Sequence, residues 1–223
     1  MNDQTKQEDL NRKAETATRA AVEEGEHILE TVRDITLKAL LSDGHLEAQK
    51  MREVVQAVLQ GASAGTKEKG TQARQSLREA MAGVDEALEK SAEASKLAIE
   101  EAAGRIKDFG SQDLKQALDD LLILEDMFLD TVKSVAKASD DTARASLNDL
   151  AQHARNSGTM VGRAATKAAE TLSRQLEKSV RDRVTTGTDT ALKVGAQLSQ
   201  AAAGFLEGIA ETLQKAGSNK KKQ

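Results

Sequence analysis

Apolar residues recur through the second half of the chain at steps of three, four and four positions. From Leu147 to Leu213, sixteen of the nineteen positions reached by these steps are apolar. Eleven residues in three helical turns keep such positions on one side of a nearly straight α-helix. A seven-residue repeat begun at Leu147 instead reaches Gln175 and Asp182, which argues against a left-handed coiled coil. The larger members of the series form what we call the apolar stripe: Leu147, Leu150, Val161, Leu172, Leu176, Val180, Val194, Leu198, Phe205, Ile209 and Leu213.

Two further segments carry helical apolar patterns. Residues 55–106 follow the same steps less regularly, and their weak middle, GASAGTKEKG at 61–70, holds three glycines. Glycine destabilises a helix interior by about 1 kcal/mol relative to alanine, so we predict a hinge or a frayed stretch there. Residues 112–138 are apolar on more than one side, which predicts the centre of a bundle. The residues expected in this bundle core are Leu114, Leu118, Leu121, Leu122, Phe128 and Val132.

The few turn signals divide the chain into three or four long helices. Residues 42–44 (SDG) end one helix, and Gly110 followed by Ser111 ends the next and starts another. Residues 139–141 (SDD) give a weaker signal for the start of a further helix. We predict an elongated antiparallel bundle of helices at about 5–41, 45–109, 112–138 and 141–215, the last two separate or continuous. The expected units are an N-terminal helical hairpin at 1–110, a C-terminal long helical segment at 111–216 and a disordered basic tail at 217–223.

Composition supports an all-α class. The 223 residues include no proline, cysteine, tryptophan or tyrosine and only three phenylalanines, so the commonest helix breaker and most β-favouring aromatics are missing. The lack of cysteine removes any need for an oxidising compartment. The first residues show no signal peptide, and no apolar run is long enough to cross a membrane. We therefore expect a cytoplasmic protein without a membrane span, able to associate with a granule or membrane surface.

Charge is distributed unevenly along the chain. Residues 1–139 carry 19 basic against 27 acidic side chains, whereas residues 140–223 carry 13 against 9. The acidic first part can pair with the basic second part, or the second part can approach an anionic surface. Solvent-exposed helix faces of uneven composition explain the same distribution of charge. Nucleic acid is not an expected partner, because the net charge is −4 and no aromatics accompany the basic residues to stack on bases.

No constellation of residues indicates catalysis. His27, His45 and His153 are isolated in the sequence, and without cysteine no metal-ligand spacing emerges. The neighbouring carboxylates of Asp119 and Asp120 point about 100° apart on a helix, so they do not converge on one atom. The glycine-rich stretch at 61–65 follows no strand and lacks the lysine and serine of a phosphate loop. We expect no enzyme activity, no catalytic or metal site and no cofactor.

The amphipathic helices are the candidates for function. In the main interpretation, a non-enzymatic protein uses the apolar stripe to coat an apolar surface, either lipid or a storage-granule polymer. The alternative is a self-contained bundle whose stripes bury one another, which oligomerises as a scaffold or binds partner helices as an adaptor. A homo-oligomer is compatible with the alternative.

Four segments carry a resemblance to known proteins: 35–40 (ITLKAL), 52–63 (REVVQAVLQGAS), 82–109 and 113–121 (DLKQALDDL). At these segments the chain resembles a proteobacterial family of all-helical proteins whose function is not established. Its proline-poor, alanine-rich helices with eleven-residue repeats also look like phasins, which coat polyhydroxyalkanoate granules. This second likeness is one of style and implies a surface-coating role, with no residue assigned to it.

Overall fold

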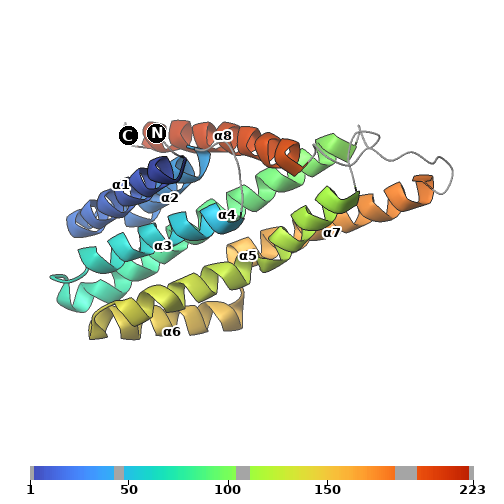
Figure 1. Cartoon of the computed structure of the whole chain (residues 1–223). Coiled ribbons are helices and arrows are strands. Elements are labelled where there is room, and N and C mark those ends of the chain that lie inside the picture. Colours follow the sequence, from blue (N-terminus) through green and yellow to red (C-terminus); the bar gives the residue numbers. More distant parts are fainter. Residues whose placement is uncertain (1–2, 43–47, 104–110, 184–194, 221–223) are drawn as a thin grey trace.

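The described part of the chain is entirely helical. A computed structural model describes residues 3–42, 48–103, 111–183 and 195–220, and Figure 1 shows no strand among them. Side chains are described for residues 5–42, 48–101, 119–174 and 200–213. The helices are α1 (Asp3–Glu24), α2 (Ile28–Leu41), α3 (Ala48–Gly65), the short 3-10 helix η1 (Gly70–Gln72), α4 (Ala73–Ala103), α5 (Ser111–Ala138), α6 (Asp141–Ser157), α7 (Met160–Arg183) and α8 (Gly195–Lys220). The predicted all-α class is confirmed.

The helices are shorter and more numerous than the three or four predicted. The segment expected as one helix at 5–41 is two helices, because Gly25 (φ 81°) and His27 (φ 51°) both adopt left-handed backbone conformations. Such conformations cannot continue a right-handed helix. The amide of Gly25 still donates to the carbonyl of Ala21 at 3.0 Å, which closes the last turn of α1. The chain then reverses, and α2 packs against α1.

The break predicted within 61–70 falls in the second half of that stretch, because α3 ends at Gly65 and turns and η1 follow it, whereas Gly61 and Gly65 themselves lie in α3. Gly61 and Gly65 are buried inside α3, where the backbone of α1 approaches so closely that a methyl group would collide with it. The partners are the carbonyl oxygens of Glu15 and Arg19 respectively. Because glycine has no side chain, α1 and α3 can pack closely at these two positions. Within residues 48–103, the described part of the helix expected at 45–109, the one interruption lies between Gly65 and Ala73, where η1 is found.

Two predicted helix boundaries are confirmed, but the single long helix expected at 141–215 is not. α5 begins at Ser111, and α6 begins after Asp140, whose carboxylate accepts a hydrogen bond from the amide of Ala143 at 3.0 Å. The segment expected as one helix at 141–215 breaks at Gly158, which has φ 77°. Residues 217–220 continue α8, although we predicted disorder there. Residues 43–44 and 110, at two predicted turns, lie outside the described residues.

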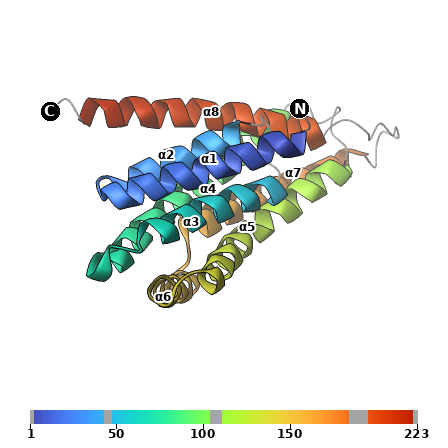
Figure 2. The same ribbon diagram turned by 60° about the vertical axis from the view of Figure 1, so that its left-hand side comes forward.

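α4 occupies the middle of the bundle. It packs against α2, α7 and α8, while α1 lies along α3, and α5 contacts α6 and α7. In Figures 1 and 2, α8 and α6 lie on opposite sides of the molecule. One connected hydrophobic cluster includes buried residues before and after residue 110, among them Leu77, Val84, Phe128 and Leu172. The described helices of both expected units thus share a core.

Candidate functional site

The described part of the apolar stripe divides into a buried and a half-buried section. Its α6 and α7 members, Leu147, Leu150, Val161 and Leu172, are buried in the core. Its α8 members Phe205, Ile209 and Leu213 are only partly buried. The remaining members, Leu176, Val180, Val194 and Leu198, lie outside the residues whose side chains are described. Of the described stripe, only α8 still offers apolar area to solvent.

The predicted bundle core on α5 is buried on one side only. Leu121, Phe128 and Val132 are buried, whereas Leu122 is 60% exposed. The assignment of Leu122 to the core is wrong, because it projects about 100° away from Leu121, on a side that none of the described helices covers. Ile123, 45% exposed, continues that side. Leu114 and Leu118 lie outside the described side chains.

Carboxylates from two other helices hold the start of α7. Glu125 of α5 accepts hydrogen bonds from the amide and the hydroxyl of Thr159, at 3.0 and 2.8 Å. Asp85 of α4 accepts from the amides of Met160 and Val161, each at 2.9 Å. The first amides of a helix have no partner within it, and its N-terminus favours negative charge. The two carboxylates therefore fix where α7 begins.

Asp85 occupies a partly desolvated position at this junction. Burial raises the pKa of its carboxyl group above the ordinary 3.8, although the hydrogen bonds from Val161 and Met160 lower it. The charge of Glu89 raises this pKa further, and Arg163 lowers it. The cost of burying the charge is thus only partly offset by the helix terminus.

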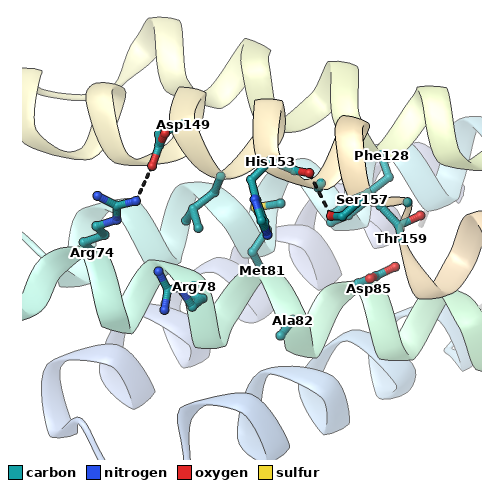
Figure 3. Close-up of a pocket in the computed structure, with 13 residues that line it drawn as sticks. Arg74, Arg78, Met81, Ala82, Asp85, Phe128, Asp149, His153, Ser157 and Thr159 are labelled. Atoms are coloured by element: carbon teal, nitrogen blue, oxygen red, sulfur yellow. Dashed lines mark hydrogen bonds and ion pairs between the residues drawn. The ribbon is translucent and has the colours of Figure 1, made fainter.

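A cleft of about 560 Å³ lies between α4 and α6, beside this junction (Figure 3). Arg74, Arg78 and Asp85 line it from α4, and Asp149 and His153 from α6. Apolar side chains contribute as well, including those of Met81, Phe128 and Leu150.

Most polar groups of the cleft already have structural partners. Arg74 forms an ion pair with Asp149, and the Ser157 hydroxyl donates to the carbonyl of His153 at 2.8 Å (Figure 3). Asp85 serves α7. Arg78 is exposed and makes no ion pair in the described part of the chain. No nucleophile is paired with a base here, so the cleft offers no recognisable catalytic arrangement.

The two described histidines, His27 and His153, and the acidic pair form no common site. His27 is exposed at the turn between α1 and α2, His153 is exposed on α6, and His45 lies outside the described residues. Asp119 is exposed, and Asp120 beside it is partly buried. Within the described ranges, no group of three or more histidine, aspartate or glutamate side chains is placed to hold a metal ion.

A second, apolar groove of about 440 Å³ runs between α4 and α8. Lys90 and Leu97 line it from α4, and Leu97 is 39% exposed. The lining residues from α8 are Gly204, Phe205, Gly208, Ile209, Thr212 and Leu213. Lys90 is its one charged lining residue in the described part of the chain. We call this surface the α4/α8 groove.

Sequence reasoning found part of this groove and missed the rest. The three stripe members on α8 were predicted as interaction residues, whereas Leu97 and the two glycines were not considered. The spacing of Gly204 and Gly208 repeats that of Gly61 and Gly65, so it was a usable signal. A Cβ atom added at Gly204 or Gly208 would meet nothing within 4 Å.

Comparison with known proteins identifies the family. A model described as a family of unknown function (DUF6781) matches residues 3–215. The chain belongs to this family. Neither the curated proteins nor the solved structures contain a match. None of the helices in the described part of the chain has the length and hydropathy of a membrane span.

Proposed function

We propose that this chain is a non-enzymatic interaction protein that binds an apolar partner through the α4/α8 groove. The observation that carries the proposal is the division of the apolar stripe, buried on α6 and α7 but accessible on α8. Leu147 and Leu172 stabilise the bundle itself, so they are not free to meet a partner. Phe205 and Ile209 have apolar area left for one.

The shape of the groove favours a partner helix over a flat surface. A groove between two helices presents apolar side chains on both walls, which suits the apolar face of a third helix. Leu97 projects from one wall, and Phe205, Ile209 and Leu213 from the other. This arrangement supports the adaptor or scaffold interpretation.

A phasin-like coating role is the second candidate. It is favoured by the line of partly buried residues Phe205, Ile209 and Leu213, which continues the eleven-residue pattern along α8. A lipid or polymer surface would contact this line in the way that it contacts an interfacial amphipathic helix. The bundle would then bind through one helix without opening.

The test compares Ile209→Asp with the wild-type chain. Binding is measured to phosphatidylcholine vesicles and polyhydroxybutyrate particles by flotation, and to a synthetic amphipathic helical peptide by fluorescence anisotropy. We expect wild type to bind at least one probe and Ile209→Asp to lose it, because a buried carboxylate in an apolar contact is costly. Far-ultraviolet circular dichroism checks that the variant keeps its helix content.

Ser134→Asp is the matched control, since it adds the same charge at an exposed position of α5. It should bind like wild type. A folded wild-type chain that binds none of the probes would contradict the proposal, and so would equal loss of binding in the control. Binding to the peptide alone supports the adaptor role, and binding to vesicles or particles alone supports the coating role.

A further inference from the structure

The cleft between α4 and α6 is lined by apolar side chains from three helices. Met81 of α4, Phe128 of α5 and Leu150 of α6 are buried along it, and Ala82 and Ala154 are partly buried. Its volume of about 560 Å³ lies in the range of ligand pockets, which are mostly apolar and orient the ligand with a few polar groups. The chemistry of the polar groups therefore indicates the class of ligand.

Both carboxylates that line the cleft already have partners. Asp149 forms an ion pair with Arg74. Asp85 accepts hydrogen bonds from two amides at the start of α7, each at 2.9 Å. The charge of Glu89 also acts on Asp85, but Glu89 lies 3.8 Å from Lys90. A cationic ligand would thus have to displace an existing partner from each aspartate.

Two donors on opposite walls of the cleft are not engaged in this way. Arg78 lines it from α4 and His153 from α6, and both side chains are exposed (Figure 3). Within the described side chains, neither the guanidinium nor the imidazole makes a hydrogen bond or an ion pair. An arginine offers five N–H donors, and a neutral imidazole offers one. The unengaged groups of the cleft are therefore chiefly donors, which suit an acceptor on the ligand.

The charges around the cleft favour a single negative charge on that ligand. Arg163 of α7 adjoins the cleft at Gly158, where a guanidinium nitrogen lies 3.8 Å from the position of an added Cβ. The charge of Arg163 also acts on Asp85. With the two arginines of α4, three guanidinium groups face two carboxylates at the cleft. A monoanion compensates this excess, whereas a dianion would bring a further negative charge towards the aspartates.

We propose that the cleft binds a small monocarboxylate with an apolar body. Its carboxylate accepts hydrogen bonds from Arg78 and His153, and its body packs on Met81, Phe128 and Leu150. A planar guanidinium suits a carboxylate because its donors can pair with both oxygens. A neutral ligand would cover Arg78 without giving its donors a partner. The site is separate from the α4/α8 groove, so this inference does not depend on the proposed function.

The experiment compares four ligands that share one apolar chain: octanoate, 1-octanol, octylammonium and octyl phosphate. Isothermal titration calorimetry with the full chain, at about pH 8 where the phosphate is a dianion, should show octanoate binding at least about tenfold more tightly than each of the others. Arg78→Gln should weaken octanoate at least about tenfold and leave 1-octanol unchanged. Arg52→Gln removes the same charge at an exposed position of α3 and should bind octanoate like wild type.

Ala82→Met tests the apolar part of the site. The longer side chain at this partly buried position occupies space in the cleft, so it should weaken octanoate and 1-octanol by a similar factor. Far-ultraviolet circular dichroism checks that each variant keeps its helix content.

Four results would overturn the proposal. Equal affinity for octanoate and 1-octanol would show that the carboxylate is not recognised, and unchanged binding of octanoate to Arg78→Gln would remove its partner. Tighter binding of octyl phosphate would assign the cleft to a dianion. A folded chain that binds none of the four ligands would contradict a site of this kind. Loss of octanoate binding in Ile209→Asp, with Arg78→Gln unaffected, would place the ligand in the α4/α8 groove instead.

Discussion

Glycine has two opposite roles in this molecule. At Gly61, Gly65 and Gly83 the absent side chain admits the backbone of a neighbouring helix, and the position is buried. At Gly204 and Gly208 it leaves free space on an exposed helix face. Sequence alone does not separate these roles, because the four-residue spacing is the same. The distinction depends on which helix lies opposite.

Alanine substitution should separate the two roles. Gly61→Ala is expected to lower the free energy of unfolding by about 1–3 kcal/mol, because its methyl group collides with the Glu15 backbone. Gly208→Ala is expected to raise it by up to about 1 kcal/mol, since alanine favours the helix and meets no atom. Urea unfolding followed by circular dichroism measures both. Equal effects of the two substitutions would disprove the assignment.

At the scale of single helices, α7 depends on partners distant in sequence. Its first amides donate to Asp85 and Glu125, which belong to α4 and α5. Gly162 lies so close beneath the Glu125 carboxylate that a side chain there would displace it. The boundary between α6 and α7 is therefore a tertiary feature as much as a local one.

Asp85→Asn tests this dependence and its pH response. At neutral pH we expect a loss of about 1–2 kcal/mol in the free energy of unfolding, because the amide accepts poorly from two backbone donors. Burial raises the pKa of Asp85, so the folded chain holds this proton more tightly than the unfolded chain. Its contribution to stability is largest below 3.8, the ordinary value, and falls as the pH rises through the raised pKa.

The difference in stability between wild type and Asp85→Asn should consequently be larger at about pH 4.5 than at pH 7. Urea unfolding at both pH values measures it. A difference that grows towards neutral pH would show that the two amide donors outweigh burial at this carboxylate.

The sequence predicted helix type and some boundaries, but not the division of the long helices. The helix starts at residues 111 and 141 were found because the signals for helix capping are local in the sequence. The break at Gly158 was missed because that residue falls on a stripe position, although Gly158 followed by Thr159 is itself a stop-and-start signal. Glu125 and Asp85 carried no local signal, since they act across 34 and 75 residues.

The sequence also predicted only part of the candidate site. Periodicity identified Phe205, Ile209 and Leu213 as one line of apolar residues, but it could not tell which part of the stripe the bundle would bury. That depends on whether another helix covers each section. The outward direction of Leu122 was missed for the same reason.

At the scale of the whole molecule, the described helices pack around one core. Thermal unfolding should therefore show one cooperative transition by calorimetry. Leu77→Ala in α4 and Leu172→Ala in α7 should each lower the free energy of unfolding by about 2–5 kcal/mol and shift the whole transition. Leu122→Ala, at an exposed position, should change it by less than about 0.5 kcal/mol.

Separate units would behave differently. If residues 1–110 and 111–216 unfold independently, two transitions appear, and each core substitution shifts only one of them. That result would support the division suggested by the sequence.

The capping of α7 also has a consequence for the order of folding during synthesis. A chain made from its N-terminus completes Asp85 and Glu125 before Thr159, Met160 and Val161, so the acceptors exist before the donors. Until α4 and α5 have docked, only local features separate α6 from α7: the left-handed Gly158 and the Thr159 hydroxyl, which accepts a hydrogen bond from the amide of Gly162 at 2.9 Å. Docking of α4 and α5 then adds the two carboxylates that hold the start of α7, so the direction of the C-terminal helices is set only after the earlier ones have folded.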